Sequence, residues 1–338
     1  MSSTQFQDQP FSSSYHAPVM WREVIEIFQD LRGVVVDGTL GGGGHSEALL
    51  HSNNHIAILG IDRDDEAIDF ASSRLSRFGN RFLPIRSAFS NLIEVLTLPV
   101  VQTWMSDKPI VGGLFDLGVS SHQLEAHNRG FSFHARDSLD MRMDTDDTMT
   151  ALSFLELVGE VELANMFREN GERKFGRFLA RKIKIAVAQR QITSAGQLRE
   201  FISSILPKRM LVGKIDPATK VFQAIRIAVN NELGELDSVL ESVPSIFHVG
   251  SKVCFISYHS GEDERVKRAF TTWTKGNCRC PAELACVCGA QVIAKTVVRM
   301  GRPKDDEMSV NPRSRSAKLR AIEMIDPVTV AVLRGRTQ

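Results

Sequence analysis

The stretch Val34-Val-Val-Asp-Gly-Thr-Leu-Gly-Gly-Gly-Gly-His-Ser46 decides the fold of this chain. Its three valines form a β-branched run that predicts a buried strand, and the run ends in an acid, Asp37. Four glycines, Gly41 to Gly44, follow and lead into a helix, because glycine lets the backbone turn sharply and approach a bound molecule closely. A strand that ends in an acid and a glycine-rich turn is typical of a nucleotide-type cofactor site at the first βα crossover of an open α/β sheet.

Strand-like and helix-like segments alternate on both sides of this turn. Apolar residues at helical spacing predict helices over 18–31, after the glycines at 47–50, from 64 to 75, and over 90–98. β-branched and apolar runs predict strands at 34–36, 56–61, 81–86 and 110–115. This alternation predicts a parallel, doubly wound α/β sheet.

The alternation stops between residues 123 and 214, where only helical patterns occur. It resumes with an amphipathic helix over 217–240, a strand over 252–258, a helix over 263–273, and β-like segments over 291–298 and 317–325. We therefore expect a discontinuous α/β domain formed by residues 16–122 and 217–338, interrupted by a helical domain at 123–216. Residues 1–15 are expected to be a disordered tail.

The composition is that of an ordinary globular protein, with 43% hydrophobic residues and a formal net charge of +1. A net charge this small means that any basic surface must be local. No apolar run approaches the length of a membrane span, and residues 1–10 lack the basic start and apolar core of a signal peptide. We expect a cytoplasmic protein with no membrane partner.

The cofactor is indicated by the acids and by the glycine spacing. Asp62 ends the second predicted strand, where an acid accepts hydrogen bonds from ribose hydroxyls. The dinucleotide fingerprint Gly-x-Gly-x-x-Gly is broken at Ser46, and no lysine follows the glycines as a P-loop requires. Asp37 would repel a pyrophosphate but suits a ligand with an amino group and a sulfonium. These features favour S-adenosylmethionine over NAD.

With the later motifs added, the chain resembles the MraW/RsmH-type methyltransferases, which methylate N4 of a cytidine in the decoding region of 16S (small-subunit) ribosomal RNA. The matching blocks are His16 with Pro18-Val19, Asp37–Ser46, Gly60–Asp64, Asp116-Leu-Gly-Val-Ser-Ser121, Arg129–Phe133, Leu139–Asp144, Gly171–Phe175, Thr219–Glu232, Ile256–Ser260 with Glu262–Arg265, and Asn311–Ser316. Tyr258 stands where phenylalanine is expected, and Gly261 where leucine is expected. The resemblance implies a Rossmann-like class I S-adenosylmethionine-dependent methyltransferase sheet with an inserted helical domain.

The resemblance also implies which residues bind the cofactor: Gly43, Gly44, His45, Asp62, Phe89, Asp116 and Gln123. The residue types agree for most of this set. Glycines allow close backbone approach, Asp62 suits the ribose, and Phe89 could pack on the adenine face or be an ordinary core residue. His45 could instead be the first residue of a helix and make no contact with the cofactor.

Methyl transfer to a cytosine amine needs a residue that orients the amine and accepts its proton or a hydrogen bond, because the nitrogen lone pair is delocalised into the ring. Asp116 follows the fourth predicted strand and is the first candidate. His259, just past the fifth strand, is the second, with a structural role as its alternative.

Binding of RNA requires a local basic surface. On a helix over 172–187, basic residues share one face: Arg173, Lys174, Arg177, Arg181 and Lys184. Arg313 and Arg315, in the segment 311–320, form a second candidate surface. Each of the two surfaces could instead be only a solvent-exposed face that binds no RNA. The expected substrate is 16S ribosomal RNA within the small subunit or a late assembly intermediate, with the target base unstacked. The protein would act as a monomer or a homodimer.

Four of the five cysteines cluster as Cys278-Arg-Cys280 and Cys286-Val-Cys288. This spacing fits either a structural zinc site or a reduced loop without metal, and we expect no metal in the catalytic site. Two other functions remain open at this point: a non-catalytic ribosome-assembly RNA-binding protein, and a nicotinamide-dependent oxidoreductase.

Overall fold

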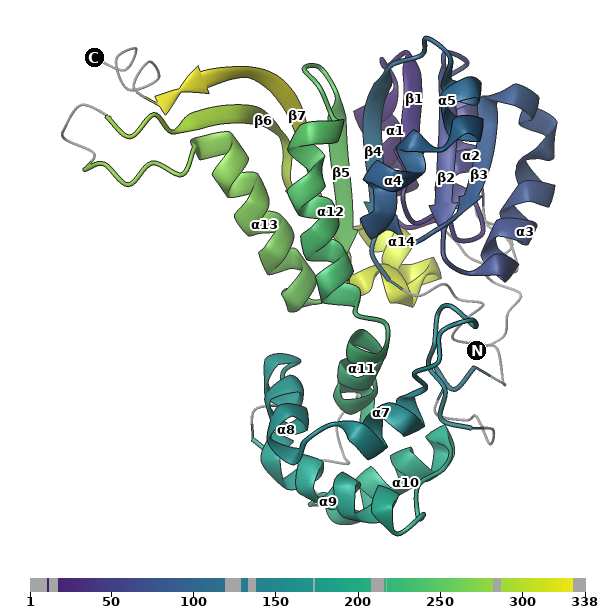
Figure 1. Cartoon of the computed structure of the whole chain (residues 1–338), viewed down its shortest axis with the longest axis vertical. Helices are drawn as coiled ribbons and strands as arrows, with labels where there is room; N and C mark the ends of the chain where they lie inside the picture. Colours follow the sequence, from purple (N-terminus) through teal and green to yellow (C-terminus); the bar gives the residue numbers. More distant parts are fainter. Residues whose placement is uncertain are drawn as a thin grey trace. The chain divides into compact units, whose positions relative to one another are not determined.

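The computed structural model of the chain describes residue 11 and residues 18–118, 129–132, 138–172, 174–207, 216, 218–281 and 287–330. The chain divides into two compact units (Figure 1). Met1–Gly118 and Glu235–Gln338 form one, called the sheet unit, and Val119–Gly234 form the other, called the helical unit. Most of the expected disordered tail, together with Gln123, Arg173 and Cys286, lies outside the described residues.

The sheet unit contains a seven-stranded sheet with the order β3-β2-β1-β4-β5-β7-β6. Its strands are β1 (Gly33–Asp37), β2 (Ile56–Asp62), β3 (Phe82–Arg86), β4 (Ile110–Asp116), β5 (Lys252–Ser257), β6 (Gln291–Gly301) and β7 (Lys318–Thr329). The first five pair in parallel, whereas β7 pairs antiparallel with β5 and with β6. The prediction of a parallel sheet, which rested on the first four strands, is confirmed for those strands, and the two late β-like segments form its antiparallel edge.

Both faces of the parallel strands are covered by helices. Val34 and Val36 of β1 contribute to one hydrophobic core, whereas Val35 contributes to the other, as the alternation of side chains along a strand requires. Two glycines in β4 show how closely the covering helices pack: a Cβ added to Gly112 would lie 2.6 Å from the Phe28 ring, and one added to Gly113 would lie 2.5 Å from the Phe247 ring. This double coverage explains why β1 and β2 read as continuous apolar runs.

The helices of the sheet unit follow the predicted order with two additions. They are α1 (Trp21–Phe28), α2 (Gly44–Ser52), α3 (Asp65–Leu75), α4 (Leu92–Thr97), α5 (Pro99–Met105), most of α12 (Glu232–Ile246), α13 (Ser260–Lys275) and α14 (Asp305–Val310). The sequence reading missed α5 and α14, which are both short. No helix within the described residues is long and apolar enough to span a membrane.

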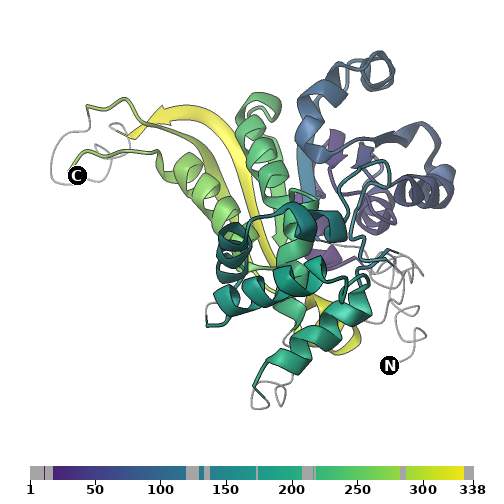
Figure 2. The ribbon, with the colours of Figure 1, turned by 60° about the horizontal axis from the view of Figure 1, so that its bottom comes forward.

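The edge of the sheet opposite β3 continues as a curved two-stranded ribbon (Figures 1 and 2). β7 pairs with β5 only through Lys318–Ser257 to Glu323–Lys252, whereas its pairing with β6 continues to Thr329. The ribbon therefore extends beyond the parallel part of the sheet.

The helical unit has a hydrophobic core of its own. It contains α7 (Ala151–Leu157), α8 (Glu160–Glu169), α9 (Gly176–Ala188), α10 (Ala195–Ile205) and α11 (Ala218–Val229). Phe167, Leu179, Leu198 and Ile225, from four of these helices, are all fully buried in that core. A unit with its own core satisfies the main physical criterion for a domain.

The predicted single helix over 217–240 was wrong, because the chain turns between α11 and α12. Asn231 adopts a left-handed backbone conformation with φ 48°, which interrupts the helix. α11 then packs into the core of the helical unit, and α12 packs on the sheet. The helical unit consequently extends to Gly234, beyond the limit of 216 expected from the sequence.

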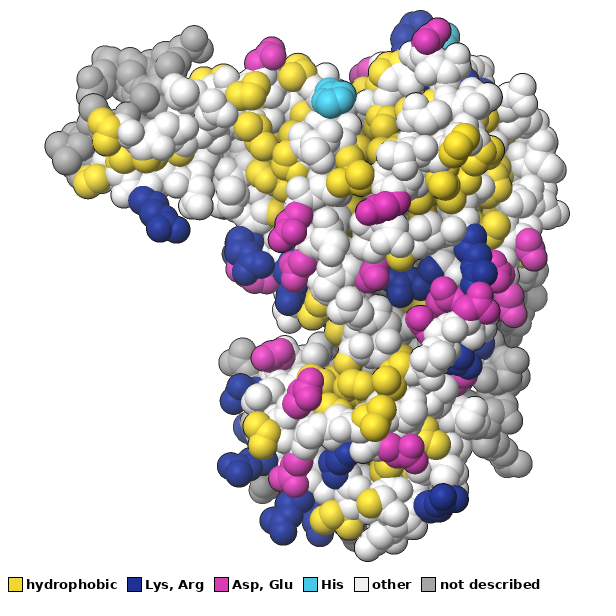
Figure 3. All heavy atoms as spheres, in the orientation of Figure 1, with side chains coloured by type: hydrophobic (Ala, Val, Ile, Leu, Met, Phe, Trp, Pro, Cys, Tyr) yellow, Lys and Arg dark blue, Asp and Glu magenta, His cyan; other side chains and the backbone are white. Residues whose placement is uncertain are grey.

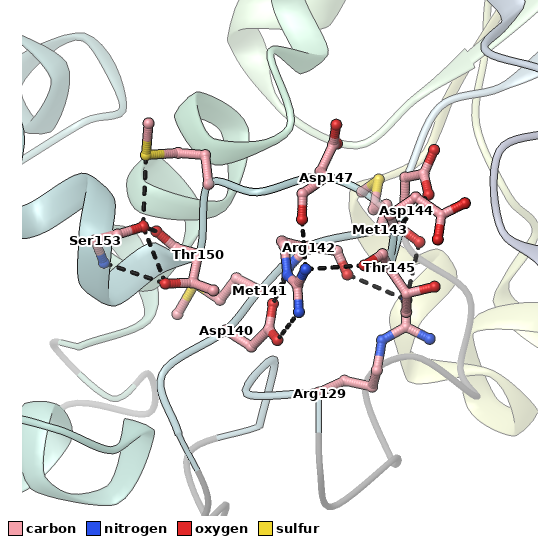
Figure 4. A network of polar contacts seen from close by, with 12 residues as sticks. Arg129, Asp140, Met141, Arg142, Met143, Asp144, Thr145, Asp147, Thr150 and Ser153 are labelled. Atoms are coloured by element: carbon pink, nitrogen blue, oxygen red, sulfur yellow. Dashed lines mark hydrogen bonds and ion pairs between the residues drawn. The ribbon is translucent and has the colours of Figure 1, made fainter.

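The loop before α7 is held by two buried or half-buried arginines (Figure 4). Arg129 donates to the carbonyls of Arg142 and Met143, at 3.1 and 2.9 Å, and Arg142 forms a bidentate pair with Asp140 at 2.7 and 2.8 Å. Burial disfavours the charged form of Asp140, but the hydrogen bonds from Arg142 hold its pKa below the usual value. These two motif blocks therefore have a structural role within the helical unit.

Candidate active site

The turn after β1 ties together the carboxyl ends of three neighbouring strands. The backbone NH of Gly41 donates to Oδ2 of Asp62 at 2.8 Å, and the NH of Asp116 donates to the Thr39 hydroxyl at 2.6 Å. The turn thus contacts the ends of β2 and β4 at once. In open α/β sheets, ligands bind at this edge.

Asp37 supports the turn from inside. Its side chain is only 1% exposed, and its two oxygens accept hydrogen bonds from the Ser46 hydroxyl at 2.6 Å and from the Thr39 NH at 3.3 Å. Burial raises its pKa, which these bonds and the nearby His45 partly offset. The sequence interpretation placed Asp37 against a cationic ligand, whereas in the structure its nearly complete burial closes it off from a ligand.

The glycines of the turn differ in what surrounds them. Gly43 has φ 72°, and an added Cβ would lie 3.1 Å from Cδ1 of Leu75 in α3. At Gly44 the added Cβ would lie 3.1 Å from Pro18. At Gly41, with φ 47°, it would meet nothing closer than the Thr39 carbonyl at 4.0 Å. Open backbone of the kind that a ligand can approach is therefore found at Gly41, a residue that was not among the expected cofactor contacts.

Asp62 is fixed at the end of β2 and can accept further hydrogen bonds. Each carboxylate oxygen accepts one backbone NH, Oδ2 from Gly41 and Oδ1 from Asp64 at 3.0 Å. A carboxylate accepts about four hydrogen bonds, so both oxygens retain a lone pair for ribose hydroxyls. Burial raises the pKa of Asp62 to about 6.

Asp116 lies between a tyrosine and a histidine. The Tyr258 hydroxyl donates to Oδ1 of Asp116 at 2.8 Å, and Nδ1 of His45 lies 3.7 Å from Oδ2. Burial raises the pKa of Asp116, with His45 and Tyr258 acting in the opposite direction. Tyr258 was not predicted as a site residue, although its departure from the expected phenylalanine was a signal that could have found it.

A backbone contact orients the ring of His45. Its Nε2 lies 2.8 Å from the carbonyl oxygen of Val19, which can only accept, so Nε2 carries a proton. The remaining nitrogen, Nδ1, faces Asp116. His45 begins α2 and is 6% exposed, so it positions Asp116 from within the protein.

His259 is the N-cap of α13. Its Nδ1 accepts from the Gly261 NH at 3.2 Å, and its Nε2 lies 3.0 Å from Oε1 of Glu262 without hydrogen-bond geometry. Glu262 in turn accepts from the NH groups of Tyr258 and His259 at 2.7 and 3.2 Å. Because Nδ1 is already an acceptor within the cap, these contacts favour the structural alternative for His259.

Phe89 follows β3 in a short 3-10 turn, Phe89–Asn91, and is half-buried. Its ring packs edge-on against the ring of Phe115 in β4, with the centroids 6.2 Å apart. This contact holds the ring while leaving part of it exposed, so the core and cofactor-stacking interpretations are compatible.

The comparisons with known proteins match nearly the whole chain. The model of the MraW methylase family matches residues 13–325. The chain belongs to the MraW methylase family. It is 43% identical over 312 residues to the ribosomal RNA small subunit methyltransferase H of a Nitratiruptor species, covering 91% of this chain and 98% of that protein. It is 42% identical over 316 residues to the protein of the same name from Geobacter sulfurreducens, covering 92% and 99%.

Among solved structures, an rRNA methylase from Streptococcus thermophilus aligns over 94% of this chain and 98% of its own, with 12% identity and a TM-score of 0.37. The family assignment, together with the sheet order, confirms the predicted class: a Rossmann-like methyltransferase that uses S-adenosylmethionine. It also removes the oxidoreductase alternative.

In this MraW methylase, helix α9 exposes basic and apolar side chains together. Arg177, Arg181 and Lys182 are exposed, as are Phe178 at 42% and Ile185 at 45%. Figure 3 shows basic and hydrophobic side chains sharing the surface of the lower, helical part with a few acidic ones. The basic face predicted from the sequence did not include Lys182.

Lys184 differs from the rest of the predicted basic set. Its Nζ donates to the carbonyls of Leu155 and Glu156, both at 2.8 Å, at the end of α7. A cation at this position satisfies carbonyls that lack helical partners. Lys184 thus has a structural role, while Lys174, like the arginines of α9, is exposed.

Arg313 and Arg315 lie in the sheet unit, in a 3-10 segment, Pro312–Ser316, and both are exposed. The segment is fixed by Asn311, which is 3% exposed and accepts from the Arg313 NH at 3.2 Å. Ser314 is fully buried between the two arginines. The backbone therefore presents both side chains outward.

Proposed function

We propose that this chain transfers a methyl group from S-adenosylmethionine to the exocyclic N4 of a cytidine in the decoding region of 16S ribosomal RNA, in the small ribosomal subunit. The names of the relatives support small-subunit ribosomal RNA as the substrate. The observation that carries the proposal is the pair of carboxyl groups, Asp62 and Asp116, held at the ends of β2 and β4 by the turn whose backbone is open at Gly41.

The residues at this edge fit the cofactor. Asp62 would accept hydrogen bonds from the ribose hydroxyls with its remaining lone pairs, and the backbone at Gly41 allows close approach. The exposed part of Phe89 would pack on the adenine. Gly43 and Gly44 act indirectly by shaping the turn, and Gln123 remains a proposed contact from the family resemblance. When bound, S-adenosylmethionine supplies an electrophilic methyl group.

Asp116 would orient the amine and accept its proton. As the amine nitrogen takes the methyl group from the bound donor, the carboxylate of Asp116 would accept the proton that the nitrogen loses. A raised pKa makes Asp116 a stronger base than a solvated aspartate. Tyr258 donates to one oxygen, and we propose the other oxygen, beside His45 Nδ1, as the acceptor.

The basic surfaces would bind the RNA backbone. Arg177, Arg181 and Lys182 of α9 can neutralise phosphates, and the exposed ring of Phe178 can stack on an unpaired base. Arg313 and Arg315 are proposed as further phosphate contacts. A base within folded RNA would have to be unstacked before its N4 reached Asp116.

The experiment that tests this function measures label transfer from radioactive S-adenosylmethionine. Small subunits that lack the modification, naked 16S RNA, and large subunits are offered in parallel. We expect label on 16S RNA and none on the RNA of large subunits. With Asp116→Asn, the rate of labelling should be at least a hundredfold lower. Equal activity of Asp116→Asn would contradict its role, and label confined to large subunits would contradict the substrate. Absence of label with normal RNA binding would favour the non-catalytic alternative.

A further inference from the structure

We propose that Cys278, Cys280 and Cys288 bind a structural Zn²⁺ ion in the loop between α13 and β6. The Sγ atoms of these three residues all lie within 4.8 Å of one another. In a tetrahedral thiolate site, Zn–S bonds of about 2.3 Å place the sulfurs about 3.8 Å apart. The three thiols therefore need to move by only about 1 Å to coordinate one ion.

The two arms of the loop bring these residues together from different parts of the sequence. Cys278 and Cys280 follow α13, whereas Cys288 precedes β6. The arms lie beside the β6–β7 ribbon (Figure 1). Their bases are joined to it, because the Val330 NH donates to the Ala290 carbonyl at 2.8 Å and Gly276 packs closely against Val330 and Gln291. Gly289 adopts φ 67°, so the chain turns immediately after Cys288.

The described part of the loop has no hydrophobic core that could hold this arrangement. None of its residues in 276–281 and 287–290 is buried, and Val287 is 87% exposed. Small loops that cannot bury apolar surface depend on metals or cross-links for a fixed structure. Clustered thiolates are soft ligands that select zinc among abundant divalent cations, and a closed zinc site takes a fourth donor besides these three.

The test measures metal in the untagged, full-length protein purified under reducing conditions. We expect about one zinc ion per chain. The double variant Cys278→Ser/Cys288→Ser should lose it, while the matched loop variant Asn277→Ser should retain it. Exchange for Co²⁺ should give thiolate-to-cobalt charge-transfer absorption in the wild type and not in the double variant.

A second measurement does not depend on the variants folding. In the wild-type protein, zinc should slow tryptic cleavage after Lys275 and Arg279 at least tenfold, and a chelator should restore rapid cleavage. Three results would overturn the proposal. The wild-type protein could hold almost no metal after incubation with Zn²⁺, it could hold iron or copper in place of zinc, or the double variant could retain its zinc. None of these results depends on methyl transfer.

Discussion

Of the acids at the ends of β1, β2 and β4, Asp37 is buried and Asp62 and Asp116 are half-buried, and the three have different partners. Asp37 is closed off and accepts from groups of the turn, Asp62 accepts two NH groups and stays partly exposed, and Asp116 contacts Tyr258 and His45. Sequence alone shows three strand-end acids, and only their contacts separate a support from a ligand-binding group. The following predictions rest on those differences.

Cofactor affinity should depend on the ionisation of Asp62. Its folded-state pKa is about 6, so about 90% of it is protonated at pH 5 and the carboxylate that accepts ribose hydroxyls is scarce. Calorimetry with S-adenosylhomocysteine should show affinity falling by up to about tenfold per pH unit below 6. Constant affinity between pH 5 and 8 would contradict this role.

The same shift affects stability with a definite sign. Because the pKa of Asp62 is higher in the folded protein than its ordinary value of 3.8, ionising it lowers the free energy of unfolding as the pH rises from about 4 to about 6. S-adenosylhomocysteine should offset that loss above pH 6 by binding the folded state. Thermal unfolding with and without the ligand measures the difference.

Tyr258→Phe should shift the pH dependence of methyl transfer. The hydroxyl of Tyr258 lowers the pKa of Asp116, so its removal raises that pKa further and moves the acidic limb of the rate profile to higher pH. We expect a loss of up to about tenfold near neutral pH and recovery at high pH. If the acidic limb of the Tyr258→Phe profile did not move, Tyr258 would not act through Asp116. The control is Asp116→Asn, whose rate profile should lack this limb.

Gly41→Ala and Gly43→Ala form a matched pair. Both place alanine at positive φ, which costs about 1–3 kcal/mol, but only the alanine at residue 43 crowds Leu75 and Ala71. Gly43→Ala should therefore lower the melting temperature more. Gly41→Ala should weaken S-adenosylhomocysteine binding at least tenfold, because its methyl group occupies the open approach. The reverse ranking in both measurements would contradict the assignment of Gly41.

At the level of the elements, α9 combines the proposed RNA-binding surface with a structural contact made by Lys184. Arg177→Ala/Arg181→Ala should weaken RNA binding and reduce its logarithmic salt dependence by about 1.5, with no change in melting temperature. Lys184→Ala should do the opposite: it lowers the melting temperature, at a cost of about 1 kcal/mol, because the end of α7 loses its cation. A filter-binding titration over a range of salt measures the first effect.

The control for that experiment removes the same charge elsewhere. Lys267→Ala/Arg268→Ala takes two exposed cations from α13 in the sheet unit. It should leave the affinity nearly unchanged. An equal loss with this control would mean that RNA responds to net charge and not to the surface of α9.

The predictable part of the fold lies in the elements with strong local patterns. Val34–Val36 predicted β1, and the glycines predicted the start of α2. The helix over 217–240 was wrong because apolar spacing continues across Asn230 and Asn231, while the change of packing partner is a tertiary effect. The direction of β6 and β7 could not be predicted for a related reason, since side-chain alternation is the same in parallel and antiparallel strands.

The site was predictable as a set of residue types and less so as a set of roles. Asp62 and Asp116 could be placed at strand ends from their position alone. The separate roles of Gly41 and Gly43, the capping role of His259 and the contact from Tyr258 to Asp116 depend on backbone angles and on residues distant in sequence. These are features that a local pattern does not contain.

At the scale of the whole molecule, the two units have separate cores and separate proposed functions. The strand ends of the sheet unit carry the groups proposed for the cofactor and the amine, and α9 of the helical unit carries an exposed basic surface. The family assignment supports methyl transfer, and the target atom is the central claim.

The most direct test of that claim is the identity of the methylated nucleoside. Small subunits lacking the modification are incubated with S-adenosylmethionine and the full-length protein. The decoding region of their 16S RNA is then isolated, digested to nucleosides and measured by mass spectrometry. We predict one new nucleoside, N4-methylcytidine, in that region, and its absence with Asp116→Asn. A methyl group on a ring carbon, on a ribose hydroxyl or outside the decoding region would contradict it.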